Sequence, residues 1–374
     1  AGVESCGACH KYDSPTGECP SIVEVDVVVI GAGGGGLGAA AALAKGGMNV
    51  ALLEKHDKVG GYMTSFTRGD YRFEVSLHAM DGLDEDGINA TVFKELGIWN
   101  KVKRVRMDPM YHVVYPDFEA TIPADPEQYR VLLGKMFPED VEGIDALWEE
   151  MYLFDGLLGA MLAAQLGDSA EYEKLMAEDP AALTKMLGLM ETSLSEALAT
   201  YTDNEQLIAV WTQLAGFAGA EPDRLSAFMF YTLWCSYYLH GYYYFEGGSA
   251  AVAEALAEVV VENGGTIYLQ TLATDIVVED GKAVQVKTAG GPCFGADYVV
   301  SNANAQLTLL HMVGAENLPS DYVARVEGLE VGLSAFTVSL GVDHDYSDLF
   351  EGTHELVVTE TYDQHANFRF VPEC

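Results

Sequence analysis

Residues 26–40 read Asp26-Val27-Val28-Val29-Ile30-Gly31-Ala32-Gly33-Gly34-Gly35-Gly36-Leu37-Gly38-Ala39-Ala40, a hydrophobic run that breaks into glycines and then into alanines. The β-branched run is typical of a strand buried on both faces, and the alanines favour a helix. Gly31, Gly33 and Gly36 have the spacing of the dinucleotide fingerprint, which allows a tight turn, backbone contact with a pyrophosphate, and close packing of helix on strand. The N-terminus of the helix would face the phosphates with free N–H groups. The stretch therefore predicts a strand, turn and helix that bind a dinucleotide.

A second predicted strand, residues 49–53, ends in Glu54. A glycine-rich loop alone is weak evidence, since such loops also occur for purely conformational reasons. A carboxylate about 20 residues after the glycines strengthens the prediction, because it would hold a ribose hydroxyl. Ala32, Leu37 and Lys55 flank these residues and are included among the predicted cofactor-binding residues.

The length and composition of the chain indicate a globular protein of two domains. Its 374 residues exceed the size to which one hydrophobic core usually grows, and 49% of them are hydrophobic. No uninterrupted apolar run approaches the length of a bilayer, so we expect no transmembrane segment. The net charge of -37 argues against nucleic acid or an anionic membrane surface as the main partner, because both would repel it. Solubility or a salty habitat explains the charge more simply than an acidic recognition surface.

Three of the six cysteines lie near the start of the chain, in a polar arm that spans residues 1–24. Cys6-Gly7-Ala8-Cys9-His10 is a CxxCH, the attachment pattern of c-type haem, in which two thiols bond the vinyl groups and His10 would bind the iron. The alternatives are a disulfide, a zinc half-site completed by Cys19, or chance. A haem also needs apolar walls and a second ligand, which this arm cannot supply alone.

The haem hypothesis determines the expected localisation. Thioether attachment belongs to oxidising compartments, so a haem-bearing chain would be exported, to the periplasm or beyond, and could exchange electrons with a cytochrome or another electron-transfer protein. Without haem we expect a cytoplasmic protein. No signal peptide is visible, but a chain that begins at Ala1 is compatible with a mature form after cleavage.

A second glycine pair, Gly60-Gly61, follows Glu54 and suits backbone that lies against phosphate or ribitol, together with Tyr62, Thr64 and Ser65. Residues 69–80 alternate enough to be a strand that runs into a loop. The segment from residue 26 to residue 80 resembles the phytoene desaturase, carotenoid isomerase and retinol saturase group of FAD-dependent oxidoreductases, within the wider amine-oxidase-like flavoproteins. The resemblance implies an α/β, Rossmann-like FAD-binding domain that is discontinuous in sequence, and a largely helical substrate domain.

Later segments extend the resemblance. Residues 111–122 predict a hairpin around Pro116-Asp117, and Pro123-Ala124-Asp125-Pro126 predicts the cap of a helix. Residues 138–239 are strongly helical. Gly247-Gly248 is similar to the glycine pair that returns the chain to the flavin domain. By resemblance Ala273 meets adenine and Asn302 lies near the flavin pyrophosphate.

The predicted domain organisation follows from these segments. After the arm of residues 1–24 we expect the first part of the FAD-binding domain (25–108), the substrate domain (109–244), the second FAD-binding part (245–315), and substrate-domain strands (316–374), including one at residues 335–342. The C-terminal glycine motif that closes the flavin site in the family is absent. The chain is truncated, or another polypeptide supplies this part, or the site is degenerate.

Catalytic candidates lie on either side of the predicted helical block. By resemblance His78 passes close to the isoalloxazine ring, and a histidine suits proton donation to a substrate carbanion. A structural histidine or a haem ligand is the alternative. The predicted helix 223–239 carries aromatic residues all round, which indicates either an ordinary core or an apolar tunnel for a flat, conjugated substrate. Tyr237, Tyr238 and Tyr242 would donate protons there or only line the pocket.

The resemblance implies an FAD-dependent oxidoreductase that reduces, desaturates or isomerises a carbon–carbon double bond in an apolar, conjugated small molecule. The flavin would carry the chemistry, so no catalytic triad is required. A c-type haem could supply electrons. One alternative is a haem or flavin electron-transfer subunit, or a scaffold, of a larger complex. A weaker alternative is an amine oxidase, which shares the fold.

Overall fold

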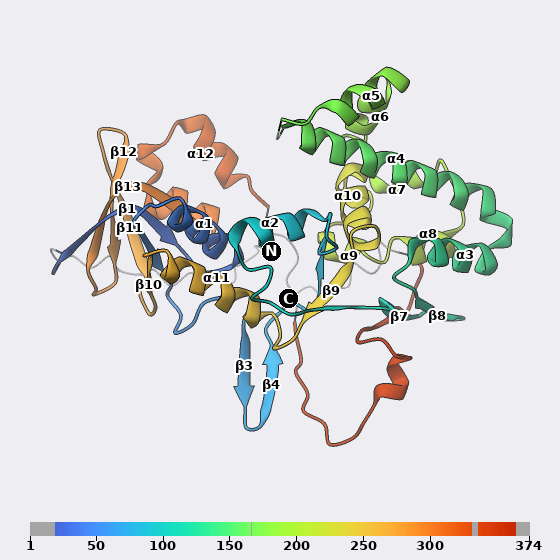
Figure 1. Ribbon diagram of the computed structural model, residues 1–374, viewed down its shortest axis with the longest axis horizontal. Coiled ribbons are helices and arrows are strands. Elements are labelled where there is room, and N and C mark those ends of the chain that lie inside the picture. Colours follow the sequence, from blue (N-terminus) through green and yellow to red (C-terminus); the bar gives the residue numbers. More distant parts are fainter. Residues whose placement is uncertain (1–18, 166, 331–335, 364–374) are drawn as a thin grey trace, which may run out of the picture. The chain divides into compact units, whose positions relative to one another are not determined.

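The computed structural model describes residues 19–165, 167–330 and 336–363. These residues form two compact units, each assembled from segments that are far apart in the sequence (Figure 1). Unit 1 holds residues 19–78, 92–104 and 245–330 of the described chain, and unit 2 holds the remainder.

Unit 1 is built on a six-stranded sheet with the strand order β10-β2-β1-β13-β12-β11. The strands β10, β2, β1 and β13 are parallel, whereas β12 and β11 run antiparallel at one edge. The central strand β1 pairs with β13 from Ile22 opposite Cys293 to Ile30 opposite Ser301. Figure 1 accordingly shows the blue β1 beside the orange β13.

The strands of unit 1 are β1 (Ile22–Ile30), β2 (Val50–Leu53), the hairpin β3 (Ser65–Arg68) and β4 (Tyr71–Glu74), β10 (Thr266–Tyr268), β11 (Ala273–Glu279), β12 (Lys282–Thr288) and β13 (Cys293–Ser301). Its helices are α1 (Gly34–Lys45), α11 (Ala250–Glu262), the π-helix η2 (Leu307–Met312), the 3-10 turn η3 (Ala315–Asn317) and α12 (Ser320–Glu327). The helix α2 (Ile88–Leu96) begins in unit 2 and ends in unit 1.

The β-branched run of β1 is buried on both faces, as its composition predicts. Val28 and Ile30 pack with Phe294 and with Met312 of η2 on one face. Side chains alternate along a strand, so Val27 and Val29 point to the other face, where the contacting pair α1 and α11 covers the sheet. The predicted α/β organisation around a buried parallel strand is therefore present.

Unit 2 is mainly helical. Its helices are α3 (Pro126–Met136), η1 (Pro138–Asp140), α4 (Val141–Gln165), α5 (Ala170–Glu178), α6 (Ala182–Gly188), α7 (Leu194–Leu198), α8 (Glu205–Trp211), α9 (Ala215–Ala218), α10 (Ala227–Tyr238) and η4 (Ser347–Phe350). A three-stranded sheet has the order β14-β7-β8, with β7 (Tyr111–Val114), β8 (Glu119–Ile122) and β14 (Leu356–Val358). A second has the order β5-β9-β6, with β5 (Met80–Asp81), β6 (Arg104–Arg106) and β9 (Tyr242–Phe245).

The helix starts in unit 2 follow capping chemistry. Asp125 caps α3 by accepting a hydrogen bond from the N–H of Gln128 at 2.8 Å, as the predicted Pro-Ala-Asp-Pro cap requires. The aromatic helix α10 begins at Ala227, not at residue 223 as predicted. Ser226 is its cap, because the serine hydroxyl accepts from the N–H of Met229 at 3.2 Å.

The unit boundaries differ from the predicted domain boundaries at two places. Residues 79–91 belong to unit 2, although the prediction assigned them to the flavin domain, because β5 pairs with β9. Residues 316–330, with α12, belong to unit 1 rather than to the substrate domain. Of the predicted strand at residues 335–342, the described part from residue 336 has no strand, and Phe336 is 93% exposed. An alternating sequence forms a strand only where a neighbouring strand pairs with it.

No helix in the described part of the chain is both long enough and apolar enough to cross a membrane.

Candidate cofactor site

A cavity lies in unit 1 where β1 and β13 end side by side. From β1 the chain enters α1 and goes on to β2 on one side of the sheet, whereas β13 continues into the loop at Asn302 on the other side. Such a switch point leaves a crevice at the carboxyl ends of the strands, where α/β proteins bind ligands. The cavity has a volume of about 460 Å³, within the range of small-molecule sites. Its lining includes nine of the predicted cofactor-binding residues: Gly31, Gly33, Glu54, Lys55, Gly60, Gly61, Tyr62, Ala273 and Asn302.

The first glycine turn forms one wall of this cavity. Gly31 has a φ of +91°, which favours glycine, and a Cβ placed on Gly36 would lie 1.8 Å from the carbonyl oxygen of Gly31. Gly33 precedes the first residue of α1, and no side chain caps the helix there. The N–H groups of the first turn of α1 are therefore suited to an anionic ligand such as a pyrophosphate.

Glu54 joins the turn to the end of β2. Its carboxylate is buried and accepts two backbone hydrogen bonds, from the N–H of Ala32 and from the N–H of His56, both at 2.8 Å. An ionised carboxylate has about four acceptor positions, so each oxygen keeps capacity for a ribose hydroxyl. The geometry fits the role that the spacing predicts for Glu54.

The second glycine pair is attached to the first turn. The N–H of Gly60 donates to the carbonyl oxygen of Ala32 at 2.8 Å, and Gly60 forms a bridge with Gly33. Gly60 and Gly61 have φ values of +114° and +59°, and a Cβ on Gly60 would lie 2.3 Å from the carbonyl oxygen of Met63. Two glycine segments thus bring bare backbone to the same wall of the cavity.

The other predicted cofactor residues lie beside this wall. Leu37 is fully buried under the turn, and Thr64 lines an adjoining cavity that also includes Glu54 and Tyr62. Ser65 begins β3, and its hydroxyl accepts from Nε of Arg72 at 2.8 Å.

The cavity lining also includes residues that were not among the predicted cofactor-binding residues, for example His56, Met63 and Leu272. The N–H of His56 donates to the carboxylate of Glu54, but a glutamate two residues earlier is not a recognised turn signal, so no sequence pattern predicted this contact. Met63 and Leu272 are ordinary apolar residues in loops, and no local pattern distinguishes them.

The four catalytic candidates divide between the units. His78 is exposed in the loop that follows β4, at the end of the first segment of unit 1. Tyr237, Tyr238 and Tyr242 belong to unit 2. Burial raises the pKa of each of the three tyrosines, so their hydroxyls are protonated near neutral pH and can act as donors.

The three tyrosines already have packing partners. The hydroxyls of Tyr238 and Tyr111 form a hydrogen bond of 2.9 Å in the core. Tyr242 donates to the carboxylate of Glu355 at 2.8 Å. The ring of Tyr237 lies 5.3 Å from that of Tyr242, measured between centroids.

The aromatic side chains of α10 form a packed core, which is one of the two alternatives that the sequence left open. The ring of Trp234 stacks on Tyr238 at a centroid distance of 4.7 Å and meets Trp148 edge to face at 5.2 Å. A void beside Trp148 and Trp211 measures only about 10 Å³, which is at most the space of a single water molecule. Stacked and edge-to-face rings fill the space between these helices.

Of the three cysteines near the start of the chain, the described residues include only Cys19. Cys19 forms a disulfide with Cys293, at the start of β13, so it does not complete a zinc half-site. Cys6, Cys9 and His10 lie outside the described residues. Within the described part of the chain, no group of three or more His, Cys, Asp or Glu side chains is placed to hold a metal ion.

Solved structures share the fold at low sequence identity. An oxidoreductase from Methanosarcina mazei superposes with a TM-score of 0.58 and 22% identity, covering 82% of this chain and 64% of that one. A putrescine oxidase variant gives a TM-score of 0.54 and 20% identity, with the same coverage of 82% and 64%.

Alignments with curated relatives cover most of this chain. A 4,4'-diapophytoene desaturase (4,4'-diapolycopene-forming) of Methylomonas sp is 25% identical over 309 residues, 81% of this chain and 58% of that protein. A chloroplastic prolycopene isomerase of an Oncidium hybrid cultivar is 26% identical over 314 residues, 82% of this chain and 53% of that protein. The all-trans-retinol 13,14-reductase of Danio rerio is 24% identical over 347 residues, 87% of this chain and 55% of that protein. The chain thus spans only a little more than half the length of these relatives.

The family model for flavin containing amine oxidoreductases matches residues 35–344, which include most of the cavity wall. The resemblance drawn from residues 26–80 is therefore confirmed, and it extends to the desaturases, isomerases and reductase named above. Because this match covers far more than half of the sequence, the chain belongs to the flavin containing amine oxidoreductase family, a family of FAD-dependent oxidoreductases.

Proposed function

We propose that unit 1 binds FAD and that the chain is the flavin-binding part of an oxidoreductase acting on a carbon–carbon double bond of an apolar, conjugated substrate. The observation that carries the first half is the cavity at the ends of β1 and β13, where buried Glu54 meets two glycine segments. The second half is supported by relatives named as a desaturase, an isomerase and a retinol reductase.

The residues of the cavity would each have a separate task. Glu54 would bind a ribose hydroxyl, and the N–H groups at the start of α1 would bind the pyrophosphate. Ala273, at the start of β11, would lie against adenine, and Asn302 would lie beside the pyrophosphate from the other side of the crevice. Bound FAD supplies hydride transfer, and these residues position it.

Two measurements test the proposal in sequence. Titration of the 374-residue chain with FAD, followed by quenching of flavin fluorescence, should show saturable binding. The absorbance of bound FAD is then followed under anaerobic conditions after photoreduction, with a conjugated polyene in one sample and putrescine added to oxidised protein in another. Recovery of the oxidised spectrum with the polyene supports the proposal. Bleaching by putrescine would instead indicate an amine oxidase, and failure to bind FAD would indicate a scaffold.

We propose His78 as the proton donor of this reaction, since the segment after β4 is the one that the family resemblance brings to the flavin. His78→Gln keeps a polar side chain but removes the titratable group. We expect the polyene-dependent rate to fall by a factor of about 100, the usual contribution of a general acid, with FAD affinity unchanged. An equal loss of FAD affinity would show that His78 has a structural role instead.

A second candidate function rests on the CxxCH at Cys6, Cys9 and His10. In this alternative the chain relays electrons through a c-type haem as a subunit of a larger complex. The Cys19–Cys293 disulfide supports the export that haem attachment requires, because disulfides persist in oxidising compartments. Protein matured with a haem-attachment system should show a Soret band that survives denaturation. Its absence would leave the flavin enzyme without this electron route.

A further inference from the structure

Three short strands of unit 2 lie beside the points at which the chain passes between the units. Within residues 19–330 the chain passes four times, after residues 78, 91, 104 and 244. The strand β5 follows the first of these points, β6 spans the third and β9 spans the fourth, and the three pair in the order β5-β9-β6. Backbone pairs Met80 with Tyr243 and Asp81 with Tyr242. This small sheet therefore gathers the segments by which the chain enters and leaves unit 2.

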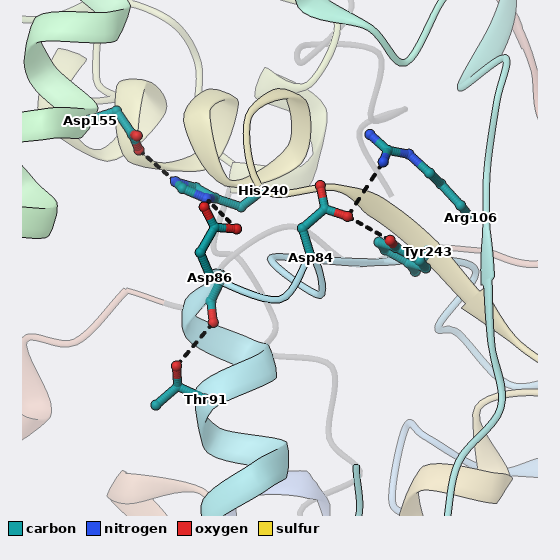
Figure 2. A network of polar contacts seen from close by, with 8 residues as sticks. Asp84, Asp86, Thr91, Arg106, Asp155, His240 and Tyr243 are labelled. Carbon is teal, nitrogen blue, oxygen red and sulfur yellow. Dashed lines mark hydrogen bonds and ion pairs between the residues drawn. The ribbon is translucent and has the colours of Figure 1, made fainter. Parts of the chain in front are cut away.

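Asp84 attaches the loop after β5 to this sheet. Its N–H donates to the carbonyl oxygen of His240 at 2.8 Å, and its carboxylate accepts from the hydroxyl of Tyr243 at 2.6 Å. The same carboxylate forms an ion pair with Arg106 of β6, at 3.5 Å. Figure 2 shows these side chains converging between the loop and β9. Loop, β6 and β9 are thus bound to one another through a single carboxylate.

His240 connects this network to the long helix α4. Its Nε2 lies 2.8 Å from a carboxylate oxygen of Asp155 on α4, and its Nδ1 lies 4.0 Å from the carboxylate of Asp86 (Figure 2). The side chains of His240 and Asp155 are 25% and 24% exposed, whereas Asp86 is 82% exposed. Water therefore screens the contact with Asp86 more strongly than the contact with Asp155.

Carboxylates face His240 from two elements, Asp155 on α4 and Asp84 and Asp86 in the loop before α2, and Arg106 on β6 forms an ion pair with Asp84. Arg106 is engaged by Asp84, so the field at the imidazole is dominated by carboxylates. The hydrogen bond to Asp155 raises the pKa of His240, the charges of Asp155, Asp86 and Asp84 add to it, and burial opposes it.

We propose that His240 is a protonation-dependent link that attaches residues 82–86 and 240–243, which adjoin β5 and β9, to α4. An imidazolium attracts carboxylates on both sides, in α4 and in the loop. The neutral ring can donate to only one carboxylate, and it loses the charge attraction that spans 4.0 Å to Asp86. Loss of one proton therefore loosens the segments that connect unit 2 to the rest of the chain.

The direction of the pH dependence follows from the raised pKa. A group that binds its proton more tightly when folded contributes its full stabilisation below its unfolded pKa, about 6.5 for histidine. That stabilisation is lost as the pH rises through the folded value. His240 therefore attaches these segments to α4 most strongly at acidic pH, and the attachment weakens as the pH rises.

Hydrogen exchange measured by mass spectrometry on the 374-residue chain tests this link. After correction for the intrinsic exchange rate, peptides covering residues 79–91 and 236–245 should be about threefold better protected at pH 5.5 than at pH 8.5, as expected for a partly exposed ion pair. His240→Asn and Asp155→Asn should abolish this pH dependence. Asp86→Asn should reduce it only in part, because Asp86 is largely exposed.

His311→Asn, an exposed histidine of η2 in unit 1, is the matched control and should leave both peptides unchanged. NMR titration of His240 in the unmodified chain is an independent test that needs no variant to fold. Equal corrected protection at the two pH values, persistence of the difference in His240→Asn, or a His240 titration midpoint below the ordinary histidine value would each overturn the proposal.

Discussion

Glu54 is the residue that ties the first glycine turn to the end of β2, because its carboxylate accepts from the N–H groups of both Ala32 and His56. Glu54→Gln replaces one acceptor oxygen with an amide that faces a backbone N–H. We expect the free energy of unfolding to fall by about 1–3 kcal/mol and the affinity for FAD to fall at least tenfold. Urea denaturation measures the first effect and quenching of flavin fluorescence measures the second.

The matched control is Glu279→Gln, which changes an exposed carboxylate at the end of β11 in the same unit. It should leave both quantities within experimental error of the unmodified protein. If Glu54→Gln binds FAD as tightly as this control, the carboxylate serves only the backbone and the ribose contact is absent.

At the scale of the element, substitution by alanine should have opposite effects on stability at two glycines of α1. A Cβ on Gly36 would lie 1.8 Å from the carbonyl oxygen of Gly31, whereas a Cβ on Gly38 meets nothing within 4 Å. Gly36→Ala must push α1 away from β1, so we expect a loss of at least about 3 kcal/mol or failure to fold. Gly38→Ala should stabilise the protein by about 0.5–1 kcal/mol, because alanine loses less entropy in a helix. Thermal unfolding compares the two, and equal effects would contradict the close packing.

The sequence predicted those elements whose signal is local. The buried strand β1, the hairpin of β7 and β8, and the Asp125 cap of α3 all follow from alternation, turn residues or capping. The start of α10 was missed by a few residues because Pro222 and Ser226 both resemble helix starts, and only Ser226 makes the cap.

The aromatic residues of α10 gave an ambiguous signal for a physical reason. A helix that is aromatic on all sides must be buried, but burial against other side chains and burial around a substrate require the same composition. The rings of Trp148, Trp211 and Tyr129, which come from other helices, fill the space. Their convergence depends on tertiary packing, which no local pattern contains.

At the scale of the whole molecule, the same distinction applies to the candidate site. Glycine spacing and Glu54 predicted residues that line one wall of the cavity, since these residues are close in sequence. The assignment of residues 79–91 to unit 2 and the pairing of Cys19 with Cys293 depend on contacts between distant segments. The cysteine pair is separated by 274 positions, so neither spacing nor composition could reveal it.

This disulfide connects the residues just before β1 to the start of β13, and it closes a loop of 274 residues. Cross-linking such a long loop restricts the unfolded chain strongly, so we expect its removal to lower the free energy of unfolding by about 2–5 kcal/mol. The double variant Cys19→Ser with Cys293→Ser should show this loss. Reduction of the unmodified protein should reproduce it, whereas the double variant should be indifferent to reductant. Mass spectrometry of unreduced peptides identifies the pair directly, and an unmodified protein whose unfolding ignores reductant would show that the bond is not formed.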